Sequence, residues 1–485
     1  MIRLDKFYIN GAWVAPDAPN MMAIKTPSTN AQIGTVALGN GVDVDRAVAA
    51  AKAAFETFSL TSKDERLTLL RKLAELTRAR LDDLAVAITM EMGAPATMSR
   101  EAQADAGLGH LEAFIAALEA HDEEETLPNG DIVSREPIGV CGLITPWNWP
   151  INQIALKVIP ALATGSTCVL KPSEHTPWSA QIYAELIHAV GYPAGVFNLV
   201  YGDGPSVGAA LSRHPDVAMM SFTGSTRAGS AVSVDAAATI KRVTLELGGK
   251  SPNVIFADAD IATAVAGGVA ECFYNTGQSC NAPTKMLVER SVYDQALSIA
   301  RAAADAQVVG DPALEGDHIG PLFDQIHYDR VQELIGIGIN EGTRLLAGGL
   351  GRPDNLPAAL QTGWFARPTV FCDVTPDMTV WQKEIFGPVL IIAPFDTEEE
   401  AITLANDTEY GLDAYLWTQD EARASRVARR LRAGGIHING RGSDYGSPFG
   451  GFKQSGNGRE GGKFGLEDYH EIKVRPPFAP SSSAD

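Results

Sequence analysis

The sequence predicts an α/β fold in which parallel sheets are covered by helices. Short, nearly continuous apolar runs recur from residue 138 to about 260, each followed by a turn with Gly or Pro and a helical stretch. Strands buried on both faces have this composition, because neither face meets water. At 485 residues the chain is too long for one hydrophobic core, so we expect two or three domains, two of them doubly wound α/β domains. The runs are Gly139–Ile144, Thr167–Leu170, Val196–Val200, Ala218–Phe222 and Asn253–Phe256.

The first 120 residues predict short strands followed by helices. Phe7–Trp13 carries an Asn-Gly hairpin signal between apolar residues. Ser62–Glu65 matches a capping box, and leucines follow at helical spacing from Leu67 onward. We expect this helical stretch to end near Met92, where Gly93 and a proline follow. A second α/β set is expected from about 262 to 450.

Two segments predict an element for assembly with other copies of the chain. Glu123–Pro137 has strand-like flanks around an Asn-Gly turn and is typical of a projecting hairpin, and Gly465–Lys473 is typical of an isolated strand. Exposed strand edges need partners, and another subunit commonly supplies them. We therefore expect a homo-oligomer. Residues 476–485, rich in Pro and Ser, are expected to be a disordered tail.

Composition excludes several classes of function. The net charge is −20 with no Lys/Arg-rich run, so a nucleic-acid partner is not expected. Five cysteines without a Cys-x-x-Cys pair fit a reducing compartment, and the nine histidines show no metal-ligand spacing. The N-terminus lacks the apolar core of a signal peptide, and no apolar stretch reaches the roughly 18 residues of a membrane span. We expect a cytoplasmic protein without metal or membrane partner.

Cys280 and Glu246 are the candidate catalytic pair. Cys280 follows Gly-Gln-Ser, and Glu246 precedes Leu-Gly-Gly-Lys. A thiolate attacks a carbonyl well, and a carboxylate can activate the water that hydrolyses the resulting thioester. The alternative for a lone cysteine is a small buried apolar residue. That alternative suits the cysteines in apolar stretches, which are Cys141, Cys168, Cys272 and Cys372.

Two glycine-rich segments compete as a dinucleotide site. Gly202–Gly208 follows a strand but has the spacing GxGxxxG, which departs from the Rossmann pattern GxGxxG. Phe222–Gly229 also follows a strand and can place free amides at a helix N-terminus, where a pyrophosphate binds favourably. Either segment can equally be a tight turn without ligand. Lys171–Glu174, after another strand, supplies groups for ribose hydroxyls.

Seven motifs in order resemble the NAD(P)-dependent aldehyde dehydrogenases, from about residue 7 to 473. The resemblance implies a Rossmann-like cofactor domain, a catalytic domain and an oligomerisation element, assembled into a dimer or tetramer. The implied ranges are 1–119 and 138–248, 249–452, and 120–137 with 453–475, respectively. The motifs are Pro146–Pro150, Lys171–Glu174, Phe222–Thr226, Glu246–Lys250, Gly277–Cys280, Glu384–Pro388 and Pro448–Lys453.

The resemblance also implies roles for individual residues. Cys280 looks like the nucleophile, Glu246 the general base, and Asn148 with the Cys280 amide the oxyanion hole. It assigns the pyrophosphate to the segment that begins at Phe222, with Gly204 in a supporting part, and implies NAD as cofactor, with NADP possible. Lys157 and Glu460 match positions of a proton relay, with a structural ion pair as the alternative. The implied cofactor residues are Ile144, Pro146, Trp147, Lys171, Glu174, Gly204, Phe222, Thr223, Gly224, Ser225, Leu247, Glu384 and Phe386.

Substrate choice is the least determined property. The residues at positions that match the family's substrate tunnel are mostly polar. Such a tunnel favours a polar or aromatic-polar aldehyde, including a semialdehyde, over a long-chain alkanal. The candidate tunnel residues are Asn152, Gln153, Asp444, Tyr445 and Phe449. Rival functions are a coenzyme-A-acylating dehydrogenase, which commonly lacks the Glu246 carboxylate, a structural protein on the same fold, and a thiol hydrolase.

Overall fold

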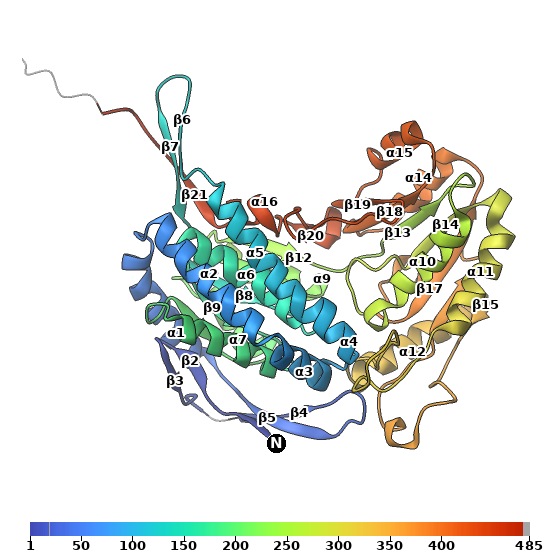
Figure 1. Ribbon diagram of the computed structural model, residues 1–485, viewed down its shortest axis with the longest axis horizontal. Coiled ribbons are helices and arrows are strands. Elements are labelled where there is room, and N and C mark those ends of the chain that lie inside the picture. Colours follow the sequence, from blue (N-terminus) through green and yellow to red (C-terminus); the bar gives the residue numbers. More distant parts are fainter. Residues whose placement is uncertain (19, 479–485) are drawn as a thin grey trace, which may run out of the picture.

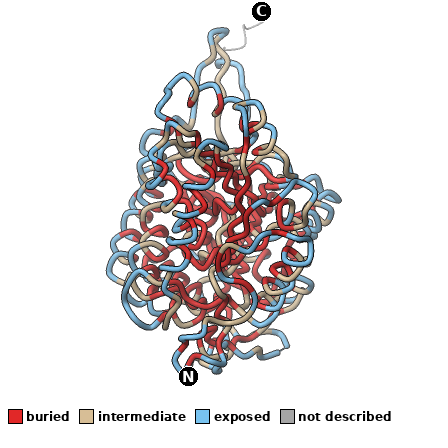
Figure 2. The backbone as a smooth tube through the Cα atoms, turned by 90° about the vertical axis from the view of Figure 1, so that its right-hand side faces the viewer, coloured by how far each residue is buried: buried red, intermediate tan, exposed pale blue. Residues whose placement is uncertain are grey.

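The computed structural model describes residues 1–18 and 20–478, and the greater part of the tail predicted to be disordered lies outside the described residues. Two large sheets dominate the structure, and a narrow hairpin arm projects from one side (Figure 1). Buried backbone runs through the interior of both halves, with exposed backbone around the rim (Figure 2). The fold is therefore mixed α/β, as the sequence predicts.

The first large sheet has eight strands in the order β20-β12-β11-β8-β9-β10-β2-β3. Its five central strands are parallel, whereas β20, β2 and β3 pair antiparallel at the two edges. Four of the five predicted apolar runs form the core strands of this sheet, because each is buried on both faces. The bounds are β2 Phe7–Ile9, β3 Ala12–Val14, β8 Val140–Ile144, β9 Thr167–Lys171, β10 Phe197–Leu199, β11 Met219–Thr223, β12 Arg242–Glu246 and β20 Gly456–Asn457.

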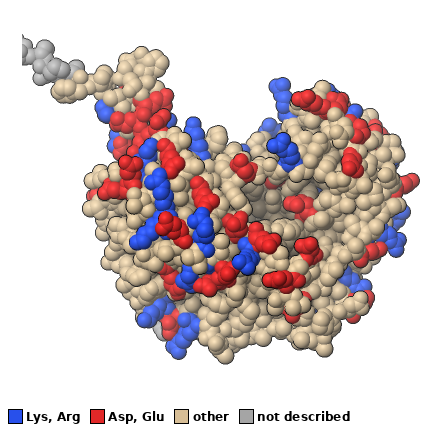
Figure 3. All heavy atoms as spheres, viewed as in Figure 1, with Lys and Arg blue, Asp and Glu red and all other residues tan. Residues whose placement is uncertain are grey.

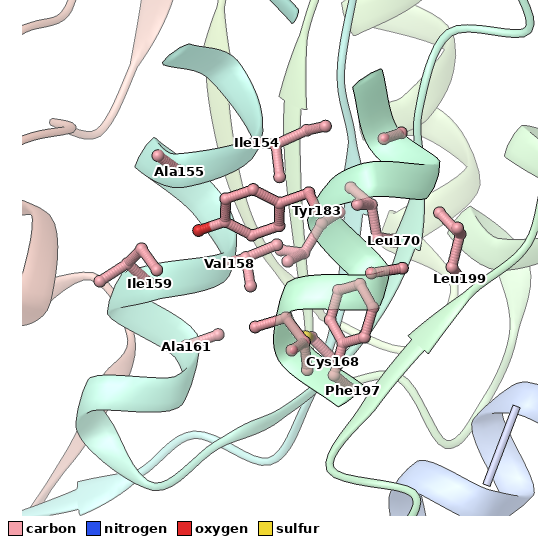
Figure 4. Packing of buried hydrophobic residues seen from close by; sticks show 14 of the residues in the cluster. Ile154, Ala155, Val158, Ile159, Ala161, Cys168, Leu170, Tyr183, Phe197 and Leu199 are labelled. Carbon is pink, nitrogen blue, oxygen red and sulfur yellow. The ribbon is translucent and has the colours of Figure 1, made fainter. Parts of the chain in front are cut away.

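Helices from the first half of the chain cover this sheet. The side chains of α6 and α7 pack around Tyr183 against β9 and β10 in a continuous apolar layer (Figure 4). The predicted capping box is present at Ser62, and Gly93 ends α3 in a left-handed conformation with φ 87°. The bounds are α1 Gly41–Phe58, α2 Lys63–Ala79, α3 Leu81–Met92, α4 Ala96–Met98, η1 Ser99–Ala104, α5 Asp105–Glu119, α6 Pro150–Thr164, α7 Pro177–Val190, η2 Gly204–Gly208, α8 Ala209–Arg213 and α9 Thr226–Ala237.

The second large sheet has seven strands in the order β15-β16-β17-β14-β13-β18-β19. All neighbours are parallel except the edge pair β15 and β16. Separate apolar clusters lie on its two faces, so helices cover both. The strands are β13 Pro252–Ile255, β14 Lys285–Glu289, β15 Arg344–Ala347, β16 Thr369–Cys372, β17 Val389–Phe395, β18 Asp413–Trp417 and β19 Gly435–Ile438. The helices are α10 Ile261–Phe273, η3 Tyr274–Gly277, η4 Arg290–Val292, α11 Tyr293–Ala306, α12 Gln325–Asn340, η5 Ala358–Leu360, α13 Thr379–Gln382, α14 Glu398–Asn406, α15 Glu421–Ala428 and η6 Lys453–Ser455.

Two three-stranded sheets complete the fold. One contains β1 Ile2–Leu4, β5 Gln32–Leu38 and β4 Asn20–Lys25, and the other is the arm, with β21 His470–Arg475, β7 Ile132–Pro137 and β6 Glu124–Thr126. The predicted hairpin is confirmed. The prediction of an isolated strand at 465–473 is wrong in two respects: α16 Gly462–Glu467 occupies its start, and β21 pairs with β7 over six residues. Burial of Leu466 explains the short helix, because α16 packs against α5.

Candidate active site

Cys280 follows a tight, strained turn at the end of α10. Asn275, Thr276 and Gly277 have φ values of 53°, 57° and 71°, three successive left-handed residues. A side chain on Gly277 would overlap the Gly387 carbonyl, so glycine is required there both for its left-handed backbone and for lack of space. The Gln278 side chain holds the turn, since its Nε2 donates to the Asn275 carbonyl at 3.0 Å and its Oε1 accepts from the Phe323 amide at 2.9 Å. Backbone strain of this kind persists only where surrounding contacts enforce it.

Asn148 is bound to the same turn. Its Nδ2 donates to the Gln278 carbonyl at 3.0 Å, and its own carbonyl accepts from Asn275 Nδ2 at 3.0 Å and Gln103 Nε2 at 3.3 Å. A side-chain amide has two N–H groups, so one remains for a ligand. The orientation of Asn148 relative to Cys280 is therefore set by a buried hydrogen-bond network rather than by sequence proximity.

Glu246 ends β12 as a buried and unpartnered carboxyl. Only 4% of the residue is exposed, and neither side-chain oxygen has a hydrogen-bond partner within the described residues. Burial, and then the negative charge of Glu460, raise the pKa of Glu246 well above its usual range, whereas Lys157 and Arg459 oppose the shift. Lys157 and Glu460 form the ion pair considered as an alternative from the sequence, and Glu460 keeps its second oxygen without a partner among the described residues.

The pKa of the Cys280 thiol is also raised. Burial contributes most, followed by the carboxylates of Glu384, Glu246 and Asp413. Glu384 itself has a pKa raised by burial to about 7, and its carboxylate accepts from the Gly249 amide at 3.0 Å. Ionised carboxyl groups near Cys280 therefore oppose formation of its thiolate, whereas a cation nearby favours it.

These groups meet at one cavity of about 720 Å³. Cys280, Glu246 and Asn148 line it, and so do most of the predicted cofactor residues. Trp147 forms one wall, stacked on Phe323 with ring centroids 4.3 Å apart. The predicted cofactor residues that line the cavity are Pro146, Trp147, Thr223, Gly224, Ser225, Leu247, Glu384 and Phe386.

Other predicted cofactor residues lie outside this cavity lining. Lys171 Nζ and Glu174 Oε2 form an ion pair of 2.9 Å at the end of β9. Burial alone would raise the pKa of Glu174, but the charge and hydrogen bond of Lys171 outweigh it and the pKa is lowered. Gly204 starts η2 with open space where a side chain would be. Ile144 and Phe222 are buried strand residues.

The predicted tunnel residues do not line this cavity. Asn152 and Gln153 lie on α6, and Gln153 Oε1 is buried without a partner among the described residues. The Tyr445 ring lies 4.8 Å from that of His110, and Asp444 binds the amide of Gly446 at 2.9 Å. The Phe449 and Glu460 backbones pair with each other. The structure therefore brings the three catalytic candidates and most of the cofactor candidates to one cavity, whereas the five tunnel candidates are not among its lining residues.

Sequence reasoning missed part of the wall. His327, Phe323 and Arg330 come from α12 and the loop before it, and no motif marks that segment. His327 Nε2 lies 2.7 Å from the Phe386 carbonyl, and burial lowers its pKa to about 4. Ile385 lies inside the Glu384–Pro388 motif and Lys383 directly precedes it, but the sequence assigned neither residue a role. The remaining missed residues are His175, Thr226, Arg227, Asp324, Ile326, Gly248 and Tyr410.

The fold and this cavity define an α/β oxidoreductase with a cysteine at its centre. Residues 13–475 match the aldehyde dehydrogenase family, to which the chain belongs. A Pseudomonas protein named 3-succinoylsemialdehyde-pyridine dehydrogenase is 52% identical over 470 residues, covering 97% of this chain and 98% of that protein. The protein oxidises an aldehyde to the carboxylic acid with NAD(P) as cofactor.

Solved structures agree with this assignment. The aldehyde dehydrogenase of Bartonella henselae matches with a TM-score of 0.96 at 49% identity, covering 98% of this chain and 99% of that one. Aldehyde dehydrogenase C of Pseudomonas syringae, in a complex with NAD⁺ and octanal, gives 0.96 at 47% identity, covering 99% and 98%. Among the described residues, no helix has the length and apolar character needed to cross a membrane. On the face drawn in Figure 3, acidic and basic side chains are interspersed.

Proposed function

We propose that Cys280 is the nucleophile of the oxidation, Asn148 the oxyanion donor and Glu246 the general base. One observation carries the proposal: the three side chains, from three separate elements, line the same cavity. A nucleophile, a hydrogen-bond donor and a base are the parts required to form and hydrolyse a thioester. Retention of Glu246 favours hydrolysis over transfer to coenzyme A.

The cavity has the features of a dinucleotide site. Thr223, Gly224 and Ser225 lie at the N-terminus of the twelve-residue helix α9, where free amides and the helix dipole favour a pyrophosphate. Trp147 and Phe386 supply apolar ring faces. Lys171 and Glu174 would bind the adenosine ribose, and Glu384 the second ribose. NAD, when bound, accepts a hydride from the substrate carbon.

The chain's own residues account for the remaining chemistry. The Cys280 thiolate adds to the aldehyde carbon, and the free N–H of Asn148 together with the Cys280 amide stabilises the oxyanion. Loss of hydride from this adduct leaves a thioester on Cys280. Glu246 takes a proton from water, the resulting hydroxide attacks the thioester, and the carboxylic acid leaves as Cys280 is regenerated. Glu460, adjacent to Glu246, can accept the proton that Glu246 gains.

Replacement of Cys280 tests the nucleophile. Cys280→Ala is expected to lower kcat by at least about 1000-fold, because the covalent intermediate no longer forms. NAD binding, measured by calorimetry, should stay near that of the parent. Cys372→Ala, a cysteine in β16 away from the cavity, is the matched control and should keep full activity. Activity of Cys280→Ala within about tenfold of the parent would contradict the assignment.

Replacement of Glu246 separates the two half-reactions. With Glu246→Gln, hydride transfer should still occur once per site, followed by very slow turnover, because the base is needed mainly for hydrolysis. Stopped-flow absorbance of NADH resolves the burst. Absence of the burst would show that Glu246 also activates Cys280.

The substrate part of the proposal is a polar semialdehyde. Two things support it: the polar side chains at 152, 153 and 445, and the 52%-identical relative whose name refers to a semialdehyde bearing a pyridine. The octanal complex of the Pseudomonas syringae enzyme supports an alkanal as the second candidate. A kcat/KM series with succinic semialdehyde, a pyridine-bearing semialdehyde, octanal and decanal distinguishes them.

A substitution at Gln153 tests the preference among these aldehydes. Gln153 is not among the residues that line the cavity, and its Oε1 is buried without a partner among the described residues. An unpartnered polar group costs about 1–3 kcal/mol, so a polar substrate that reached Gln153 would gain about 5–150-fold. Gln153→Met, of similar size, should therefore shift kcat/KM from the semialdehydes toward octanal. A parent that prefers decanal, or a variant with unchanged preference, would contradict the polar assignment.

Assembly and organisation complete the proposal. Ile472 and Val474 on β21 are 65% and 62% exposed, an unusual exposure for apolar side chains on a strand edge, and this supports a homodimer or a tetramer of dimers. We keep the domain ranges that were inferred from the sequence. The five free cysteines support a cytoplasmic location, because a reducing compartment keeps thiols unpaired. Light scattering of the parent and of an Ile472→Glu, Val474→Glu variant tests the interface, since a monomeric parent would exclude it.

A further inference from the structure

Three side chains on the second large sheet lie behind the Cys280 turn. Asp413 and Tyr415 share one face of β18, and His437 is the neighbour of Tyr415 on β19. His437 Nε2 lies 3.0 Å from Asp413 Oδ2, and the rings of Tyr415 and His437 stack at 4.4 Å and 10°. The Tyr415 hydroxyl donates to the carbonyl of Asn281, the residue after Cys280, at 3.1 Å. A continuous set of contacts thus joins Asp413 to the nucleophile segment.

The residues around Asp413 accommodate a buried carboxylate. Only 3% of the residue is exposed, and its strand neighbour is Gly435. A side chain at 435 would overlap Asp413 Oδ1, so glycine there makes room for the carboxylate. Burial of an anion is costly unless a donor or cation compensates it, and His437 is that partner. Neither Asp413 nor His437 belongs to the machinery of the proposed mechanism.

The charges around these groups define what the cluster can do. After burial, the negative charges of Glu384, Glu246 and Asp413 raise the pKa of the Cys280 thiol. Burial alone would lower the pKa of His437, but the hydrogen bond and charge of Asp413, with a smaller contribution from Glu271, raise it. While it is protonated, the His437 imidazolium therefore offsets one of the anions that oppose a thiolate, and this effect is lost as the pH rises through the raised pKa of His437.

We propose that Asp413, His437 and Tyr415 are positioning residues for the nucleophile: the first two set the local charge behind Cys280, and Tyr415 holds the segment that follows it. This inference rests on the proposed role of Cys280. It makes the reactivity of the thiol depend on residues that touch neither substrate nor cofactor, through charge and through one hydrogen bond.

The test is the rate of Cys280 alkylation by iodoacetamide from pH 6 to about pH 11, a range that extends above the ordinary pKa of a thiol, measured on the full-length protein without ligand by mass spectrometry. Asp413→Asn should move the midpoint of the profile down by about half a unit, because an anion near the thiol is lost. His437→Gln should react about threefold more slowly at pH 6 yet match the parent at pH 9. Tyr415→Phe should lower the rate by a similar factor at every pH, without moving the midpoint.

Matched controls and a second readout separate charge from structural damage. His214→Gln and Asp354→Asn, at residues that do not line the cavity, should reproduce the parent profile. The KM for NAD should stay constant in the three cluster variants, while kcat falls for His437→Gln and Tyr415→Phe. A variant that misfolds would instead expose the Cys280 thiol to the reagent and raise this KM.

Two results would overturn the inference. One is an unchanged midpoint for Asp413→Asn, and the other is the same ratio of His437→Gln to parent at pH 6 and pH 9. Failure of the proposed function gives a different result. If Cys280→Ala remains active, the assignment of Cys280 as nucleophile is wrong, whatever the alkylation profiles show. If Cys280→Ala is inactive but the profiles of the cluster variants are unshifted, only the positioning role is contradicted.

Discussion

Gly450 lies against the proposed base, and an added methyl group there should damage only the second half-reaction. Its φ is +149°, a backbone conformation that residues with a side chain rarely adopt. A Cβ at this position would be 2.6 Å from Glu246 Oε1 and 2.8 Å from the Gly458 carbonyl. Because one of these contacts is backbone, the carboxylate is the group that must move in Gly450→Ala.

The magnitude follows from two costs. The strained backbone costs about 1–3 kcal/mol, and the overlap adds about 1–3 kcal/mol. A catalytic group misplaced by about 1 Å loses about 10²-fold in rate. We therefore expect kcat to fall about 100-fold, with the unfolding temperature lowered by a few degrees. The NADH burst, which precedes the action of Glu246, should keep its full amplitude.

Stopped-flow absorbance at saturating NAD and aldehyde measures both phases. Gly191→Ala is the control: Gly191 caps α7 with φ +89°, and no atom lies within 4 Å of the position that its Cβ would take, so the variant carries backbone strain without a clash. It should lower stability but leave kcat unchanged. A lost burst in Gly450→Ala, or a kcat equal to the parent's, would refute the assignment of Glu246 to thioester hydrolysis.

Three further predictions concern ionisation. Glu384→Gln should lower the midpoint of Cys280 alkylation, since a carboxylate with a pKa of about 7 is ionised at the pH where the thiol titrates; an unchanged midpoint would show that the two groups are not coupled. Glu174→Gln should improve kcat/KM with NADP relative to NAD by about tenfold, because an anion that repels the 2′-phosphate is lost and Lys171 is freed; no change would place the ribose elsewhere. Burial lowers the pKa of His470 from 6.5 to about 3, so its contribution to stability is complete above pH 6.5 and is lost as the pH falls toward 3. Urea unfolding of the parent should therefore lose about 2 kcal/mol more than His470→Gln between pH 7 and pH 5, and equal losses would contradict this.

The sequence by itself determined the elements whose signal is local. The apolar runs that became β8, β9, β10 and β11 were recognisable because a strand buried on both faces needs apolar residues at every position. Helix α2 was recognisable from its cap and leucine spacing. The short helix α16 at the start of the last predicted strand was not recognisable from the sequence. Leu466 is buried there against α5, and packing outweighs local preference.

At the site, too, some residues could be predicted from the sequence and others only from the folded structure. Cys280 and Glu246 lie in short motifs with glycine and polar neighbours, which marked them as candidates, whereas Asn148 became a candidate only through the resemblance to the family. His327 and the Asp413–His437 pair could not be predicted, because an ordinary helix and two ordinary strands carry them. Only strand register places His437 beside Tyr415, and only folding brings Asp413 close enough to affect Cys280. Motifs report the residue types that a reaction needs, whereas the charges that set their ionisation come from distant parts of the chain, which only the tertiary structure brings together.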